Sequence, residues 1–140
     1  MNTPLKASYD KKIMIAGKDY SKEQKMQKRW EEGHLSGEVP GDNLTLVLEY
    51  DMRGIEAITL IIKVHAVEGS GTDVNLLVNG YAYYDEDDTS YTPTAYPICS
   101  ETLSDGDVKK IVVNEPLAKL EVYMSTTGDM LYSLDYIARW

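Results

Sequence analysis

The sequence predicts an all-β fold, an antiparallel β-sandwich of the jelly-roll kind, preceded by an N-terminal extension that contains a short helix. From residue 44 onward, apolar and polar residues alternate as they do in strands that bury one face. Turns rich in Gly, Asp and Asn separate these segments at close spacing, which is typical of two packed antiparallel sheets. A length of 140 residues with 43% hydrophobic content suits one domain with a buried core.

The first three predicted strands each place apolar residues on one face. In LTLVLEY these residues are Leu44, Leu46, Leu48 and Tyr50. In AITLIIKVHAV they are Ile58, Leu60, Ile62, Val64 and Ala66. In TDVNLLVNGYAYY they are Val74, Leu76, Val78 and Ala82. Gly80 predicts a bulge or a bend, and the Gly-rich segment 68–73 predicts a hairpin turn between the second and third strands.

The second half of the chain continues this pattern after an interruption. The acidic segment 85–97 predicts a long projecting loop, because its two prolines cannot donate to a sheet ladder. A short apolar segment around Ile98 follows, and then the predicted strands VKKIVV, LAKLEVYMS and MLYSLDYIARW. The inward residues of the last two are Leu120, Val122, Met124, Tyr132, Leu134, Tyr136 and Ala138.

Residues 1–40 are predicted to form a basic arm, and residues 41–140 the β-sandwich domain. Within the arm, SKEQKMQKRWEEG predicts a helix over about 22–32, with Ser21 as N-cap and Gly33 as the stop. Met26 and Trp30 lie one turn apart and form its thin apolar stripe. The helix therefore either docks on a partner or covers the end of the sandwich.

The charge of the chain is unevenly distributed. Residues 1–30 hold eight Lys and Arg against three Asp and Glu, whereas residues 31–140 hold six against twenty. The acidic body repels phosphate, so we expect no nucleic-acid partner. The basic arm is either a solvated face or the one part of the chain suited to contact DNA or an acidic neighbour. For such a contact we expect binding through Lys22, Lys25, Met26, Lys28, Arg29 and Trp30.

No pattern in the sequence predicts catalysis. His34 and His65 have no carboxylate or serine at a suggestive spacing, and the single cysteine, Cys99, fits a buried structural thiol. The acidic run 85–88 lacks the spacing of a calcium loop and is typical of a solvated projection. We therefore expect a non-enzymatic protein without a metal or cofactor. We also expect no signal peptide and no membrane partner, since no segment approaches the apolar length that spans a bilayer.

Tyrosine is the unusual feature of the composition, with eleven Tyr and no Phe. If Val74, Leu76 and Val78 face inward, then their neighbours on the strand face solvent beside a Tyr-containing loop. The resulting cluster comprises Leu77, Tyr81, Tyr83, Tyr91 and Tyr96. Such rings fit a protein interface or a platform for glycans, unless the loop itself covers them.

The segments GSGTDVNLLVNG, SDGDVKKIVV and LEVYMSTTGDMLYSLDYI give residues 41–140 a family likeness. This region resembles the β-sandwich domains of virion structural proteins of tailed phages, of the capsid decoration (cement) and head-auxiliary type. The resemblance implies a structural virion protein that is assembled in the host cytoplasm in several copies. Its partners would be the major capsid protein or other virion subunits, and we expect a homo-oligomer. The same strand pattern occurs in carbohydrate-binding modules, so the alternative is a carbohydrate-binding or receptor-binding module.

Overall fold

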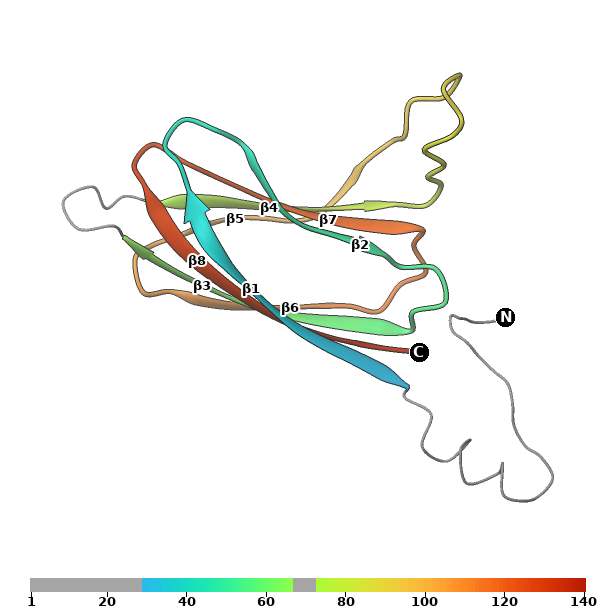
Figure 1. The fold of residues 1–140 in the computed structure, drawn as a ribbon, viewed down its shortest axis with the longest axis horizontal. Helices are drawn as coiled ribbons and strands as arrows, with labels where there is room; N and C mark the ends of the chain where they lie inside the picture. The colour runs from blue at the N-terminus through green and yellow to red at the C-terminus, as the bar shows by residue number, and fades with distance from the viewer. Residues whose placement is uncertain (1–28, 67–72) are drawn as a thin grey trace, which may run out of the picture.

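The described part of the chain is a β-sandwich of two antiparallel four-stranded sheets (Figure 1). The computed structural model describes residues 29–66 and 73–140. Sheet A contains β1 (Trp30–Val39), β3 (Ala57–Ala66), β6 (Val108–Val113) and β8 (Met130–Arg139). Sheet B contains β2 (Thr45–Asp51), β4 (Val74–Tyr81), β5 (Tyr96–Leu103) and β7 (Lys119–Thr126). The residues in these ranges form no helix.

The strand order identifies the sandwich as a jelly roll. Sheet A has the order β1-β8-β3-β6, and sheet B has the order β2-β7-β4-β5. Only β4 and β5 are consecutive strands that pair with each other; the other connections between consecutive strands cross from one sheet to the other. The all-β sandwich predicted from the sequence is therefore confirmed.

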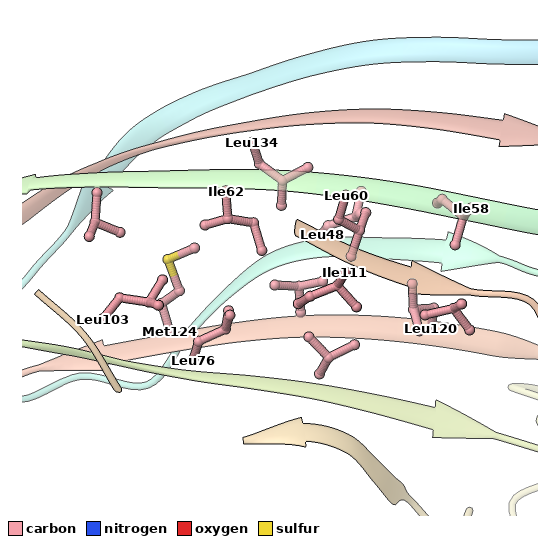
Figure 2. Close-up of a cluster of buried hydrophobic side chains, with 14 of the residues drawn as sticks. Leu48, Ile58, Leu60, Ile62, Leu76, Leu103, Ile111, Leu120, Met124 and Leu134 are labelled. Carbon is pink, nitrogen blue, oxygen red and sulfur yellow. The ribbon is translucent and has the colours of Figure 1, made fainter. Parts of the chain in front are cut away.

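The core lies between the sheets and is built from the alternate residues that the sequence pattern marks (Figure 2). Ile58, Leu60, Ile62 and Val64 of β3 are buried, as predicted. Leu120 and Met124 of β7 face them from sheet B (Figure 2), and Val122 of the same strand is also buried. At about 25 cal/mol per Å² of buried apolar surface, this layer is the main stabilising contribution to the fold.

Polar pairs close both open sides of the sandwich. On one side, the Tyr50 hydroxyl of β2 donates to the Glu31 carboxylate of β1, and its ring meets that of Tyr136 edge-on, with the ring centroids 5.5 Å apart. On the other side, the Lys109 ammonium of β6 lies 2.5 Å from the Glu101 carboxylate of β5. Each pair joins an edge strand of sheet A to an edge strand of sheet B.

Within the described residues, three predictions about the secondary-structure elements are wrong. Residues Trp30–Glu32 belong to β1, and not to a helix, because the whole strand pairs with β8 from Trp30 opposite Arg139 to Val39 opposite Met130. The sandwich therefore begins at least ten residues before the predicted boundary at residue 41. The segment 22–28 lies outside the described residues. The predicted hairpin between β3 and β4 is absent from the pairing, since β3 pairs with β6 and β8 while β4 pairs with β5 and β7.

Three predicted inward residues face solvent. A bulge between Leu46 and Leu48 shifts the register of β2 against β7, so that Leu48 is buried whereas Leu44 and Leu46 are exposed. Ala82 is also exposed, because β4 ends at Tyr81. The bulge or bend predicted at Gly80 is not seen in β4, which pairs with β7 without interruption through Gly80. The register shift between Val78 and Asn79 instead leaves Ile98 of the partner strand β5 as the extra residue.

Candidate functional site

The outer face of sheet B carries a polar depression at one end, which we call the acidic hollow. It has a volume of about 530 Å³. Its lining residues are Glu49, Asp51, Arg53, Tyr84, Asp85, Glu86, Asp87, Ala118 and Lys119. Five of these are acidic and two are basic, so the hollow carries a net negative charge.

Strand alternation places the floor of the acidic hollow. In β7, Leu120 and Val122 point into the core, so Lys119 and Glu121 point outward from the same strand. Strand pairing then sets Asp51 and Tyr81 on either side of Lys119. The loop between β4 and β5 leaves sheet B at this end and rises away from the body (Figure 1).

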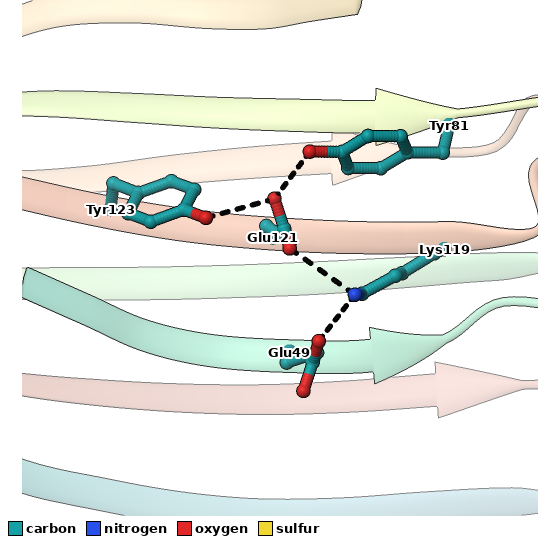
Figure 3. Close-up of polar contacts among 5 residues, drawn as sticks. All are labelled: Glu49, Tyr81, Lys119, Glu121 and Tyr123. Atoms are coloured by element: carbon teal, nitrogen blue, oxygen red, sulfur yellow. Dashed lines mark hydrogen bonds and ion pairs between the residues drawn. The ribbon is translucent and has the colours of Figure 1, made fainter. Parts of the chain in front are cut away.

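A network of ionic and hydrogen bonds links three strands across this floor (Figure 3). The Lys119 ammonium pairs with the Glu49 carboxylate of β2 and lies 3.2 Å from Oε2 of Glu121. The other oxygen of Glu121 accepts hydrogen bonds from the hydroxyls of Tyr81, at 2.7 Å, and Tyr123, at 3.1 Å. The network therefore fixes β2, β7 and β4 relative to one another on their outer face.

Lys119 and Glu121 are buried although they lie on an outer face. Their exposed fractions are only 5% and 6%, whereas the side chain of Glu49 is half exposed. The ring of Tyr84 covers Lys119, with Nζ 3.6 Å from the ring centroid, and the Tyr84 and Tyr81 rings meet edge-on at 5.7 Å. A buried cation and a buried carboxylate are stable here because each has several partners.

The pKa values of these groups reflect both their burial and their hydrogen bonds. Burial alone would lower the pKa of Lys119, but hydrogen bonds to Glu49, Tyr84 and Glu121 outweigh it and raise the pKa. Burial, together with the hydrogen bond to Glu121, raises the pKa of Tyr81 to about 12. The pKa of Tyr123 is raised for the same reasons. At neutral pH the ammonium is charged and both phenols are neutral donors.

The rim of the acidic hollow is chemically different from its floor. Asp85, Glu86 and Asp87 lie on the loop and are exposed, so their charges face solvent. The Glu121 carboxylate is engaged by Lys119 and by the hydroxyls of Tyr81 and Tyr123, whereas the rim presents exposed carboxylates to an approaching partner. This arrangement favours binding of a cationic group at the rim.

A second depression adjoins the acidic hollow at the end of the sandwich. It has a volume of about 620 Å³ and shares Arg53, Tyr84, Asp85 and Ala118 with the hollow. Its other lining residues are largely apolar: Met52, Gly54, Ile55, Ala82, Tyr83, Pro116 and Leu117. The two depressions give this end of the molecule a continuous, indented surface.

The predicted aromatic platform is divided in the structure. Tyr83 and Tyr91 come together on the loop, with ring centroids 5.2 Å apart, and both are exposed. Tyr81 belongs to the Lys119 network, and Leu77 lies half-buried further along β4, opposite Tyr123. Tyr96 is exposed at the start of β5 and pairs with Gly80. The five residues therefore do not share one surface.

Most of the predicted arm contacts lie outside the described residues, namely Lys22, Lys25, Met26 and Lys28. Arg29 is exposed, and its carbonyl accepts a hydrogen bond from the backbone N–H of Trp140 at 3.0 Å. The exposed fraction of Trp30 is 45%, and it lies at the first position of β1. These two residues are accessible to a partner, but they lie at the start of β1 on sheet A and not at the acidic hollow.

The remaining candidates have local partners. Nδ1 of His34 lies 2.5 Å from Oδ1 of Asp135 on the neighbouring strand β8, a pairing that sequence spacing does not reveal. Cys99 is half-buried, and burial raises the pKa of its thiol. In the loop, Asp85 and Asp88 accept backbone hydrogen bonds from Asp87 and Ser90. Across residues 29–66 and 73–140, no three His, Cys, Asp or Glu side chains converge as metal ligands would.

Sequence reasoning missed the residues that form the floor of the acidic hollow. Lys119 and Glu121 alternate with core residues in β7, and they look like an ordinary solvated strand face. Their proximity to Glu49 depends on the pairing of β7 with β2, whose sequence separation is about seventy residues. Nothing local in the sequence specifies that pairing.

Comparison with known proteins adds little to these observations. No protein-family model matches the chain, and no curated protein is similar to it. Among solved structures, a chain of Bacillus endospore appendages, described as disulfide-linked pili, aligns over 94% of this chain and 97% of its own length. The identity is 10% and the TM-score is 0.48.

A second solved structure is the xylanase 10B of Clostridium thermocellum, whose CBM22-1 and GH10 modules were determined with xylohexaose. It aligns over 80% of this chain and 26% of its own length, with 14% identity and a TM-score of 0.39. The chain thus matches about a quarter of that protein.

Within residues 29–66 and 73–140, no helix has the length and apolar character needed to cross a membrane.

Proposed function

We propose that the protein is a non-enzymatic structural β-sandwich that assembles with neighbouring subunits, its own copies included. The basic N-terminal segment of one chain would lie against the acidic hollow of the next. One observation carries this proposal, which is the separation of charge within the chain. Residues 1–28 hold seven Lys against three Asp and Glu, whereas the hollow carries five acidic residues against two basic ones.

The chemistry of the rim suits such a contact. Exposed carboxylates at 85–87 attract lysines from a distance, and the attraction weakens as salt shortens the screening length. A segment of 28 residues reaches at most about 90 Å when extended, which is enough to cross to a neighbouring subunit. If the segment binds the hollow of a neighbouring subunit, the extent of assembly depends on protein concentration. If it binds the hollow of its own chain, no such dependence arises.

The state of the floor supports a non-enzymatic role. Lys119 is held by two carboxylates, and Glu121 is held by Lys119 and two tyrosine hydroxyls. None of these groups is poised as a free nucleophile or base. The network instead stiffens the sheet beneath the rim, which is what a lattice subunit needs.

The experiment compares the full chain with a variant in which Lys22, Lys25 and Lys28 are changed to Glu. The wild type should form species larger than the variant does in sedimentation at low salt. Changing the same lysines to Arg keeps the charge and should keep the assembly. Equal masses for the wild type and the Glu variant, at low and high salt, would overturn the proposal.

The acidic side of the contact has its own test. The double change Glu86→Gln with Asp87→Asn should weaken assembly at low salt, because it removes two rim charges. Glu115→Gln, at an exposed turn elsewhere, should leave assembly unchanged. If both variants assemble as the wild type does, the acidic hollow is not the receiving surface.

The specific assembly that we propose is a virion lattice, in which the protein acts as a capsid decoration or other head or tail auxiliary subunit. Its support is the resemblance of residues 41–140 to such proteins, together with a domain that needs no disulfide. Purified protein should pellet with capsid particles, and the Lys-to-Glu variant should pellet less. Absence of co-pelleting with particles would remove the virion role and leave assembly among copies.

A second candidate function rests on the Tyr83–Tyr91 pair. These two exposed rings meet edge-on beside the indented end of the sandwich, and sugar rings stack on such aromatic surfaces. A glycan-binding module should change its tyrosine fluorescence on a glycan panel and lose the change in Tyr83→Ala. A flat response of the wild type across the panel would exclude this candidate.

A further inference from the structure

The outer face of sheet A gathers exposed apolar side chains, and it is separate from the acidic hollow. Five large hydrophobic residues on this face are exposed: Trp30, Val108, Val112, Leu131 and Ile137. They point outward because the alternate residues of the same strands, such as Ile111 and Leu134, are buried in the core. An apolar sheet face of this kind marks an interaction surface.

The centre of this face is apolar and slightly hollowed. Ile61 and Ile137 line a depression of about 480 Å³, together with Thr59 and the His34–Asp135 pair. Strand pairing sets Ile61 beside Asp135 and Lys110, and Thr59 beside Ile137 and Val112. The apolar band therefore runs across β8, β3 and β6, with charged residues on both sides of it.

The charges on this face are divided between its two halves. The half formed by β1 and β8 carries Glu32 and Glu38, together with Asp135 and Arg139, whose charges cancel. The half formed by β3 and β6 carries Lys63 and Lys110. One half is thus net negative, the other is net positive, and the face as a whole is neutral.

This distribution is self-complementary under a two-fold rotation. The sheet order is β1-β8-β3-β6, so a two-fold axis parallel to the strands places β1 of one copy over β6 of another and β8 over β3. Each negative half then faces a positive half, and the strand register sets Ile137 of one copy over Thr59 of the other, next to Ile61. We infer that the outer face of sheet A binds a second copy of this chain in a face-to-face dimer.

The charges also indicate which partner binds the outer face of sheet A, a second copy of the chain or the chain's own N-terminal segment. A neutral face offers little attraction to a segment with seven Lys and three acids, whereas the acidic hollow does. The dimer is therefore a contact distinct from the one under our proposed function, and either one can fail alone.

The test uses the full chain with Lys22, Lys25 and Lys28 changed to Glu, so that the arm contact does not contribute. This protein should be a dimer by sedimentation equilibrium. Adding Ile137→Lys should raise the dimer dissociation constant at least about tenfold, since it places a charge in the apolar centre. The matched control is Leu46→Lys on sheet B, where the exposed fraction is 45% against 44% for Ile137.

A charge exchange tests the two-fold geometry. Glu32→Lys with Glu38→Lys, and Lys63→Glu with Lys110→Glu, should each weaken the dimer about threefold to tenfold, because both halves then carry the same sign. The fourfold variant, in which each half has the opposite charge, should restore the dimer. Circular dichroism and thermal melts on each variant separate loss of dimer from loss of fold. A monomer in the parent protein, or equal effects of Ile137→Lys and Leu46→Lys in folded variants, would overturn the inference. So would a fourfold variant that dimerises more weakly than both double variants.

Discussion

Lys119 is the central residue of the polar network on the outer face of sheet B. It neutralises Glu121, and both side chains are almost entirely buried. Taking a charge out of water is costly, so either group alone would be destabilising in this place. The pair is tolerated because Glu49, Tyr81, Tyr84 and Tyr123 supply the remaining contacts.

Replacing Lys119 by Met should lower the free energy of unfolding by about 3–5 kcal/mol, because it leaves Glu121 buried without its cation. The double variant Lys119→Met with Glu121→Leu should recover most of that loss, since no buried charge remains. Urea denaturation of the three proteins measures both values. A single variant as stable as the wild type would contradict the assigned network.

Tyr81 gives the network a signature at high pH. Its pKa in the folded protein is about 12, above the ordinary value of 10.0, so the neutral phenol is favoured by folding. The resulting stability is fully present below pH 10 and is lost as the pH rises through 12. In the difference between wild-type and Tyr81→Phe absorbance, the phenolate should appear near pH 12. A titration midpoint at the ordinary tyrosine pKa would show that the Tyr81 hydroxyl does not donate to Glu121 in solution.

At the scale of elements, β1 shows why a strand was missed. Its inward positions include Gly33 and Gly37, so the sequence lacks the apolar alternation that marks the other strands. The apolar cover comes from Tyr136 and Tyr132 of β8, which pair directly opposite these glycines. The local capping signals for a helix were therefore outweighed by long-range pairing with β8.

Gly33 should resist even a small side chain. An added Cβ would lie 2.5 Å from Cε2 of Tyr136, so Gly33→Ala must displace that ring. We expect a loss of about 1–3 kcal/mol in the free energy of unfolding. Ser36→Ala, outward on the same strand, should change it by less than about 0.5 kcal/mol. Equal thermal melts for the two variants would show that the ring does not cover Gly33.

The elements that sequence reasoning predicted well are those whose signal is local. The inward residues of β3, β7 and β8 follow strict alternation, and the structure buries them except for Ala66, Tyr132 and Tyr136, which are half-buried. The errors lie where a single residue or a distant partner decides the outcome. The bulge after Leu46 points the Leu46 side chain to solvent, and the sheet order places β3 and β4 in different sheets. The acidic hollow could not be predicted for the same reason, since it needs β2 and β7 side by side.

For the molecule as a whole, two surfaces matter. The acidic hollow lies on the outer face of sheet B, and the apolar face with balanced charges lies on sheet A. The strand order of a jelly roll puts these surfaces on opposite sides of one rigid core. A subunit with one salt-sensitive contact and one largely apolar contact can extend an assembly through both.

Sedimentation velocity of the unmodified chain at low and at high salt tests the central claim most directly. The account predicts particles larger than a dimer at low salt, which fall to the dimer as salt screens the lysine contacts with the acidic hollow. A monomer in both conditions, at concentrations where assembly is expected, would contradict it.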